Sequence, residues 1–164
     1  MNSTSVPFAI LAATGNEALQ HAWRQDAAPQ LCFEVSLNEE HIFLGVALGN
    51  GRHLDLGERA HHYAMVTLAR RRLADAERGI EPSGQGWIEV ERLARMLGID
   101  QSHLNIQIFR ARQQLTRALP AGFDTPVLLE RRRGEIRIGA LGFRIMRGSS
   151  MEGRYHPQAT CKAL

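Results

Sequence analysis

The sequence has few cysteines and no long apolar run, and both shortages exclude classes of protein. Its 164 residues include 2 cysteines, Cys32 and Cys161. They are too few and too far apart to form a disulfide framework or a metal-binding motif. We therefore expect a reducing, cytoplasmic location. The apolar run over residues 6–13 is much shorter than a bilayer-spanning helix, and no lysine or arginine precedes it. We expect neither a signal peptide nor a membrane anchor.

Catalytic and metal-ligating patterns are also missing from the sequence. Ser149, Ser150 and Cys161 could supply a nucleophile, but no motif positions a base beside them, so no enzymatic activity is expected. We expect His61 and His62 to lie on the exposed side of a helix. Four histidines lack acidic or cysteine partners at a helical or zinc-finger spacing, so neither a metal nor another cofactor is expected: His41, His53, His61 and His62.

Positive charge is the feature that the sequence does have, and it is unevenly distributed. The formal net charge is +3, and the sequence pI is near 9.4. Residues 110–137 hold seven arginines and three acidic residues. A basic patch of this kind attracts phosphates, first those of nucleic acid and second those of an acidic membrane. A solvated basic surface without a partner is the alternative. The run Arg70-Arg71-Arg72 is expected to be a solvated helix end, with phosphate contact as the alternative.

The order of apolar and turn residues predicts an α+β fold. Alternation predicts antiparallel strands over 31–37, 41–48 and 52–56, with a hairpin turn at Gly49-Asn50-Gly51. Helices are expected over 57–76, 87–97 and 101–118, with Ile88 able to pair with a later strand. Residues 120–126 would be a linker, 127–138 a β-hairpin turning near Arg133-Gly134, and 141–145 a final strand. We divide the chain into an extension (1–30), one domain (31–147) and a flexible tail (148–164).

The stretch over residues 97–119 carries the most specific pattern. Gly98 suits a helix C-cap, and the Asp100 carboxylate can cap the next helix. Spacings of 4, 3 and 4 place Leu104, Ile108, Ala111 and Leu115 on one buried stripe. The opposite face is cationic and has no carboxylate; it carries Ser102, His103, Ile106, Arg110, Gln113 and Arg117.

The segment Leu104 to Leu115 resembles the recognition helix of OmpR/PhoB-type response-regulator effector domains, and the hairpin over 127–138 resembles their wing. Residues 68–139 are also similar to a winged-helix module found C-terminal to forkhead-associated domains. The resemblance implies a winged helix-turn-helix with a small N-terminal antiparallel sheet, three helices and a C-terminal β-hairpin wing. We expect no phosphoacceptor receiver domain before the sheet, and Phe109 stands where the family often has a basic residue.

The resemblance also implies roles for individual residues. Ile106 would touch a thymine methyl group, and Arg110 would donate to a guanine edge or a phosphate. Ser102, His103, Gln113 and Arg117 would contact the DNA backbone. The wing arginines Arg131, Arg132 and Arg133 would reach the minor groove.

Two functions are compatible with these patterns. The first is sequence-specific binding of double-stranded DNA by a cytoplasmic transcriptional regulator that acts as a homodimer and does not contact a membrane. The second is a protein-protein interaction module that uses Ile106 and Phe109 for docking and does not read DNA. In the first function, Phe109 would contact DNA together with Ile106, and both residues could instead belong to the core of a helix that is buried on two sides.

Overall fold

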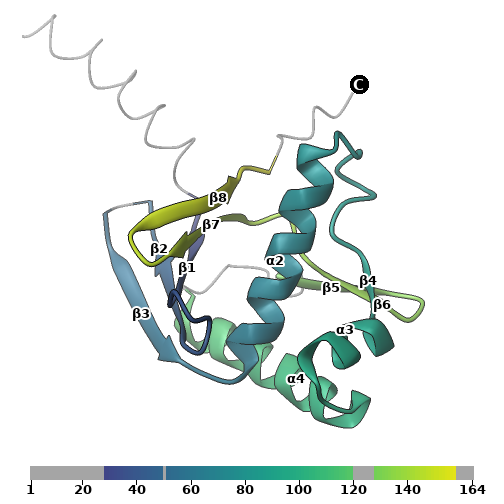
Figure 1. Cartoon of the computed structure of the whole chain (residues 1–164). Helices are drawn as coiled ribbons and strands as arrows, with labels where there is room; N and C mark the ends of the chain where they lie inside the picture. Colours follow the sequence, from purple (N-terminus) through teal and green to yellow (C-terminus); the bar gives the residue numbers. More distant parts are fainter. Residues whose placement is uncertain (1–27, 50, 120–127, 158–164) are drawn as a thin grey trace, which may run out of the picture.

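The structure is a computed structural model that describes residues 28–49, 51–119 and 128–157. Within these residues the chain is α+β, with three helices and two β-sheets (Figure 1). The strands are β1 (Gln30–Val35), β2 (Ile42–Ala47), β3 (His53–Glu58), β4 (Ile88–Glu89), β5 (Leu129–Arg132), β6 (Glu135–Ile138), β7 (Gly142–Arg147) and β8 (Ser150–Tyr155). The helices are α2 (His61–Glu77), α3 (Val90–Leu97) and α4 (Gln101–Ala118).

The larger sheet has five strands in the order β3-β2-β1-β7-β8, so the predicted three-stranded N-terminal sheet is incomplete. β1 pairs with β2 in the antiparallel sense and with β7 in the parallel sense, with Gln30 opposite Gly142. The predicted final strand therefore exists as β7, and it joins the N-terminal strands at the centre of the sheet. This pairing could not be predicted from alternation, because alternation gives the faces of a strand and not its neighbours.

The prediction of a flexible tail from residue 148 is wrong for β8. Gly148 adopts a left-handed conformation with φ of 58°, and the chain returns along β7 with Ser150 opposite Arg147. β8 is an edge strand that is mostly exposed except for Tyr155, so it lacks an apolar alternation that sequence reading could detect. The unpatterned segment is ordered by its hydrogen bonds to β7.

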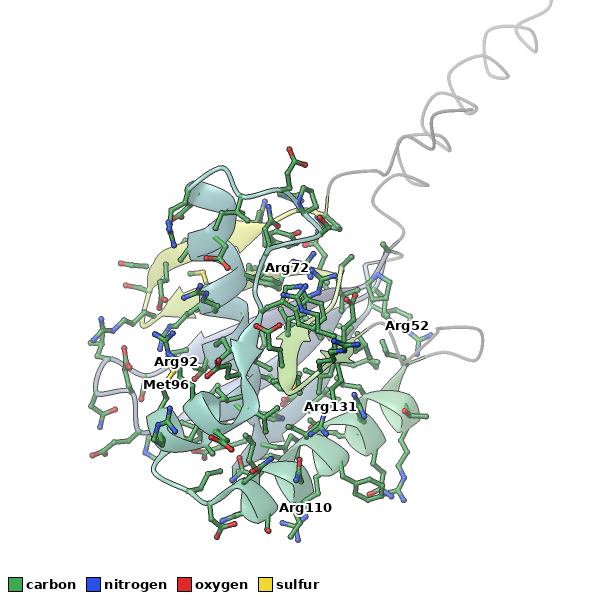
Figure 2. The ribbon with its side chains drawn as sticks, turned by 90° about the vertical axis from the view of Figure 1, so that its right-hand side faces the viewer. Arg52, Arg72, Arg92, Met96, Arg110 and Arg131 are labelled. Atoms are coloured by element: carbon green, nitrogen blue, oxygen red, sulfur yellow. The ribbon has the colours of Figure 1, made fainter. Side chains whose placement is uncertain are left out.

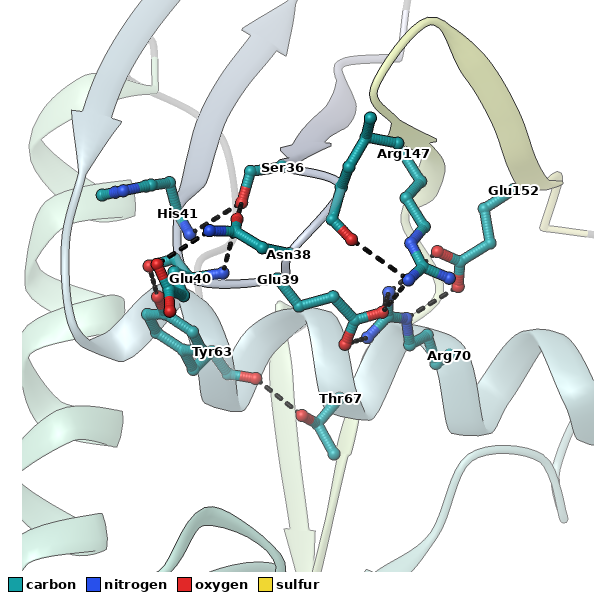
Figure 3. A network of polar contacts seen from close by, with 11 residues as sticks. Ser36, Asn38, Glu39, Glu40, His41, Tyr63, Thr67, Arg70, Arg147 and Glu152 are labelled. Atoms are coloured by element: carbon teal, nitrogen blue, oxygen red, sulfur yellow. Dashed lines mark hydrogen bonds and ion pairs between the residues drawn. The ribbon is translucent and has the colours of Figure 1, made fainter.

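Ion pairs fix the β8 edge to α2 (Figure 3). The Nε atom of Arg70 lies 2.7 Å from a Glu152 carboxylate oxygen, and the Arg70 guanidinium also reaches Glu39 at 3.3 Å. Arg147 donates to the carbonyl oxygen of Leu37 at 3.2 Å. These contacts connect the β1–β2 turn, α2 and β8. Arg70 is therefore paired, which corrects the expectation that it lies at a solvated helix end.

Arg72, the third member of the arginine run, is buried, with 2% of its surface exposed. It donates to the carbonyl oxygen of Ile138 at 2.6 Å, and its guanidinium carbon lies 4.9 Å from the centre of the Tyr155 ring. A buried arginine requires such partners because a desolvated charge is costly when unpaired. Arg72 thus connects α2 to β6 and β8 from inside the molecule.

The turn between α3 and α4 has the predicted caps. Gly98 is left-handed with φ of 67°, and the amide of Ile99 donates to the carbonyl oxygen of Ala94 at 3.1 Å. The Asp100 carboxylate accepts from the His103 amide at 2.8 Å. α4 spans the residues predicted for it, Gln101–Ala118, and its predicted stripe is buried with at most 3% exposure: Leu104, Ile108, Ala111 and Leu115.

The other two helices begin later than predicted because strands occupy their expected first turns. α2 begins at His61, since β3 continues to Glu58 with Gly57 left-handed at φ of 66°. α3 begins at Val90, since Ile88 pairs with Ile136 of β6, as the sequence allowed. The smaller sheet therefore has the order β4-β6-β5, and its β5–β6 hairpin turns at Arg133-Gly134 as predicted.

α3, α4 and the β5–β6 hairpin lie together at one end of the molecule, where α4 contacts α2, α3 and β3 (Figure 1). No helix within the described ranges is long and apolar enough to cross a membrane. Several predictions concern residues outside the described ranges: most of the 1–30 extension, the turn residue Asn50, the 120–126 linker and Cys161.

Candidate nucleic-acid interface

The outward side of α4 is exposed over its whole length and has no carboxylate. We call this surface the α4 face; it consists of Ser102, His103, Ile106, Phe109, Arg110, Gln113 and Arg117, all of which are exposed. Ile106 and Phe109 are 50% and 64% exposed, so the alternative that they belong to the core is wrong. Their spacing of three places them side by side on the helix. The α4 face therefore combines positive charge with an apolar pair.

Figure 2 shows Arg110 extending from α4 away from the rest of the molecule. Neither Arg110 nor Arg117 forms a hydrogen bond or ion pair with any other residue in the part of the chain that the structure describes. No acidic residue occurs between Gln101 and Ala118 to pair with them along the helix. The charge of both guanidiniums is thus available to an external anion.

The arginines of the β5–β6 hairpin differ in their freedom to contact a ligand. Arg131 lies above α4 in Figure 2 and donates to the Oδ1 atom of Asn105 at 2.7 Å. Arg132 lies 2.7 Å from Glu135. Arg133, at the turn, is exposed and has no hydrogen bond or ion pair within the described ranges. Of the three predicted wing arginines, Arg133 is therefore the one whose guanidinium can bind a ligand without losing a contact within the described ranges.

The Trp87 ring packs against two arginines of the β5–β6 hairpin. The guanidinium carbons of Arg132 and Arg137 lie 4.2 Å and 4.3 Å from the centre of its ring. Arg137 also donates to the carbonyl oxygens of Ser83 and Gln85 at 3.0 Å and 3.1 Å. Cation–π contacts of this kind hold a guanidinium in one orientation. Arg132 and Arg137, two of the seven arginines in residues 110–137, therefore fix the position of the hairpin.

A second link joins the hairpin to α4. Arg112 donates from its guanidinium to the carbonyl oxygen of Leu129, the first residue of β5, at 2.8 Å. Together with the bond between Arg131 and Asn105, it fixes the start and the outer half of β5 relative to α4. The α4 face and Arg133 consequently form parts of one rigid surface.

A groove lies beside the α4 face, between α4 and the residues that precede and begin α2. We call it the Arg59 groove; its volume is about 570 Å³. Arg110 and Arg117 line one side, and Arg59 lines the other. The remaining lining residues also include no carboxylate: Ala60, His61, His103, Gln107, Gln113, Gln114 and Ala118. The groove is therefore a positively charged concave surface continuous with the α4 face.

The floor of the Arg59 groove contains a buried polar cluster centred on Gln114. The Gln114 amide nitrogen donates to the carbonyl oxygen of Leu56 at 2.9 Å, which directs its amide oxygen toward two histidines. This oxygen lies 2.6 Å from Nε2 of His61 and 2.9 Å from Nε2 of His62. Nδ1 of His62 also lies 3.3 Å from the carbonyl oxygen of Ile42, so both ring nitrogens of His62 face oxygen acceptors. The cluster links α2 to α4.

Both histidines are buried, with 7% exposure for His61 and none for His62, so the expectation of an exposed position is wrong. Burial lowers the pKa of each imidazole, and Arg59 lowers both further by repulsion. The hydrogen bond to Gln114 opposes the effect in both cases. Helical periodicity alone could not reveal this, because the burying surfaces come from β2, β3 and α4.

Sequence reading missed four residues that shape this surface: Arg59, Asn105, Gln114 and Trp87. Asn105, Gln114 and Trp87 act through partners far along the chain, and Arg59 acts through the groove that it forms with α4. The described residues contain no group of three histidine, cysteine or acidic side chains that could hold a metal ion.

Comparison with protein-family models, with curated proteins and with solved structures gives no match to this chain. A function for the α4 face and the Arg59 groove is therefore inferred from their geometry and charge.

Proposed function

We propose that this protein binds double-stranded DNA in a sequence-specific manner, with α4 in the major groove and the β5–β6 hairpin beside it as a wing. A regulator of transcription is the protein class that this proposal implies. Contacts to base edges in the major groove provide specificity, and contacts to phosphates provide affinity.

One observation carries the proposal: Arg110 and Arg117 extend from a helix face without any carboxylate and have no partner within the described ranges. Unpaired cations at this density repel one another, and phosphates relieve the repulsion. Arg110 lies four residues after Ile106, so a guanine contact and a thymine-methyl contact would fall on neighbouring base pairs.

The arrangement of elements supports a winged helix-turn-helix. α3 and α4 are joined by a tight turn at residues 98–100, and the hairpin that follows in the chain is bonded to α4 through Asn105 and Leu129. In this proposal, Arg133 at the hairpin turn approaches a minor groove, where narrow tracts attract arginine. Arg131 and Arg132 would instead position Arg133.

We further propose that two copies bind two half-sites, because one module of this size buries a limited interface with DNA. Half-site spacing near one helical turn is the expected outcome of selection from a random-sequence library. Sedimentation of the protein with the selected duplex tests the stoichiometry; a ratio of one to one on every selected duplex contradicts it.

Selection of bound duplexes from a random-sequence library is also the decisive test of DNA binding. We expect an enriched motif and an affinity that falls steeply with salt. Absence of binding to any duplex at low salt contradicts the proposal.

The rival function is docking of a protein partner on Ile106 and Phe109, which are exposed side by side. Substitution Phe109→Glu and the double substitution of Arg110 and Arg133 to glutamine separate the two functions. DNA binding requires that the arginine variant loses affinity and salt dependence. A partner that is lost with Phe109→Glu, retained by the arginine variant and insensitive to salt supports docking instead.

A further inference from the structure

We propose that the Arg59 groove is a phosphate-binding site that extends the α4 face toward the start of α2, with Arg59 as its main anchoring residue. The inference rests on the proposed function, since the DNA backbone is the most direct source of such a phosphate. A small phosphorylated molecule would present the same chemistry, and titration with free phosphates distinguishes the two sources.

The charge of the groove is the first argument. Three guanidiniums line it, from Arg59, Arg110 and Arg117, and no carboxylate does. The nearest acidic residue in the chain, Glu58, is directed to Nδ1 of His41 at 2.9 Å and is not part of the lining. Like charges around one concavity raise its affinity for an anion and strengthen its field.

The availability of donors is the second argument. Arg59 donates from one terminal nitrogen to the carbonyl oxygen of its neighbour Glu58 at 2.7 Å, and this is its only hydrogen bond within the described ranges. The other guanidinium nitrogens remain free, as do those of Arg110 and Arg117. Guanidiniums bind phosphate oxygens in a bidentate manner, so both sides of the groove offer donors that suit a phosphate.

The rigidity of the floor is the third argument. Gln114 is held by three hydrogen bonds, to Leu56, His61 and His62. It therefore fixes the start of α2, which follows Arg59, relative to α4, which carries Arg110 and Arg117. A site that does not need to be assembled on binding has a lower entropic cost.

The test compares Arg59→Gln with Arg154→Gln, which removes the same charge from an exposed arginine on β8 without a partner in the described ranges. Both variants are titrated with a duplex selected by the wild-type protein, over a range of salt concentrations. We expect Arg59→Gln to weaken binding to all duplexes alike and to lower the slope of log K against log salt by about 1. The sequence preference should remain that of the wild type.

A second arm locates the phosphate. A set of duplexes is prepared, each with one phosphate replaced by a neutral methylphosphonate. At one position, the replacement should lower the affinity of the wild-type protein but leave the affinity of Arg59→Gln unchanged. Such non-additivity indicates direct contact. If the wild type binds the duplex and Arg59→Gln matches Arg154→Gln in affinity and slope, the groove proposal is overturned while the proposed function stands.

A third arm tests the other source. Pyrophosphate and inorganic phosphate are titrated while the NMR signals of the Arg59 guanidinium and the His61 ring are followed. Suppose that the protein binds no duplex but shows saturable shifts with phosphate, and that Arg59→Gln abolishes these shifts. This result supports the groove as a site for a small phosphate and overturns the proposed function. Absence of both responses overturns both proposals.

Discussion

The Arg131 guanidinium donates to the amide oxygen of Asn105 across 2.7 Å and so joins the β5–β6 hairpin to the exposed side of α4. Asn105→Ala removes this acceptor without changing charge. We expect DNA affinity to fall by roughly 0.5 to 1.5 kcal/mol, because the hairpin loses its fixed position. Fluorescence anisotropy with the selected duplex measures the loss. Gln101→Ala removes a neighbouring exposed amide as the control; equal losses in both variants contradict the positioning role.

Arg110 should contribute to specificity as well as affinity. Arg110→Ala is expected to cost about 1 to 3 kcal/mol on the selected duplex and less on a scrambled one. Arg92→Ala is the matched control, because Arg92 is an exposed arginine on α3 that Figure 2 places away from Arg110. Anisotropy titrations on both duplexes check the difference. A uniform loss on both would assign Arg110 to a phosphate.

Trp87 should stabilise the hairpin through its two guanidinium contacts. Trp87→Leu is expected to lower the free energy of unfolding by about 1 to 2 kcal/mol, since two cation–π contacts at partly exposed positions are lost. Trp87→Phe keeps an aromatic face and should retain part of the stability. Urea denaturation monitored by circular dichroism measures both variants. If Trp87→Phe is as unstable as Trp87→Leu, packing volume or the indole hydrogen bond to Ser83 is responsible instead.

Stability should depend on pH through His61 and His62. Burial lowers the pKa of both imidazoles in the folded protein. The unfolded chain therefore takes up protons first when the pH falls below about 6.5, and the free energy of unfolding decreases from there downward. We expect His62→Gln to flatten this dependence in urea denaturation between neutral and mildly acidic pH. His156→Gln, which removes an exposed imidazole, is the matched control. An unchanged slope for His62→Gln contradicts the assignment.

The predictions that succeeded depend on local physics. The caps at Gly98 and Asp100 and the stripe from Leu104 to Leu115 follow from the geometry of one helix, and the structure has them as expected. Local patterns of this kind need no knowledge of distant segments. The pairing of Ile88 with the hairpin was allowed by the sequence, but its partner, Ile136, lies far along the chain.

The predictions that failed depend on contacts between distant segments. His61 and His62 have no distinctive sequence context, and their burial depends on Gln114 and the strands. β8 has no apolar alternation, and its position depends on pairing with β7 and on the ion pair with Arg70. Most arginines of the basic patch looked equivalent in the sequence. The structure separates those with partners, such as Arg137, from those without a partner in the described ranges, such as Arg110.

The parallel pairing of β1 with β7 has a consequence for folding order. Gln30 and Gly142 are neighbours in the sheet although nearly the whole domain separates them in the sequence. Contacts between residues so far apart in the sequence form only after a long loop has closed. The entropic cost of this closure slows folding. The local contacts of α3, α4 and the hairpin can form earlier. Refolding followed by pulse-labelled hydrogen exchange should therefore protect the amides of α4 before the β1 and β7 amides that bond across the β1–β7 pairing.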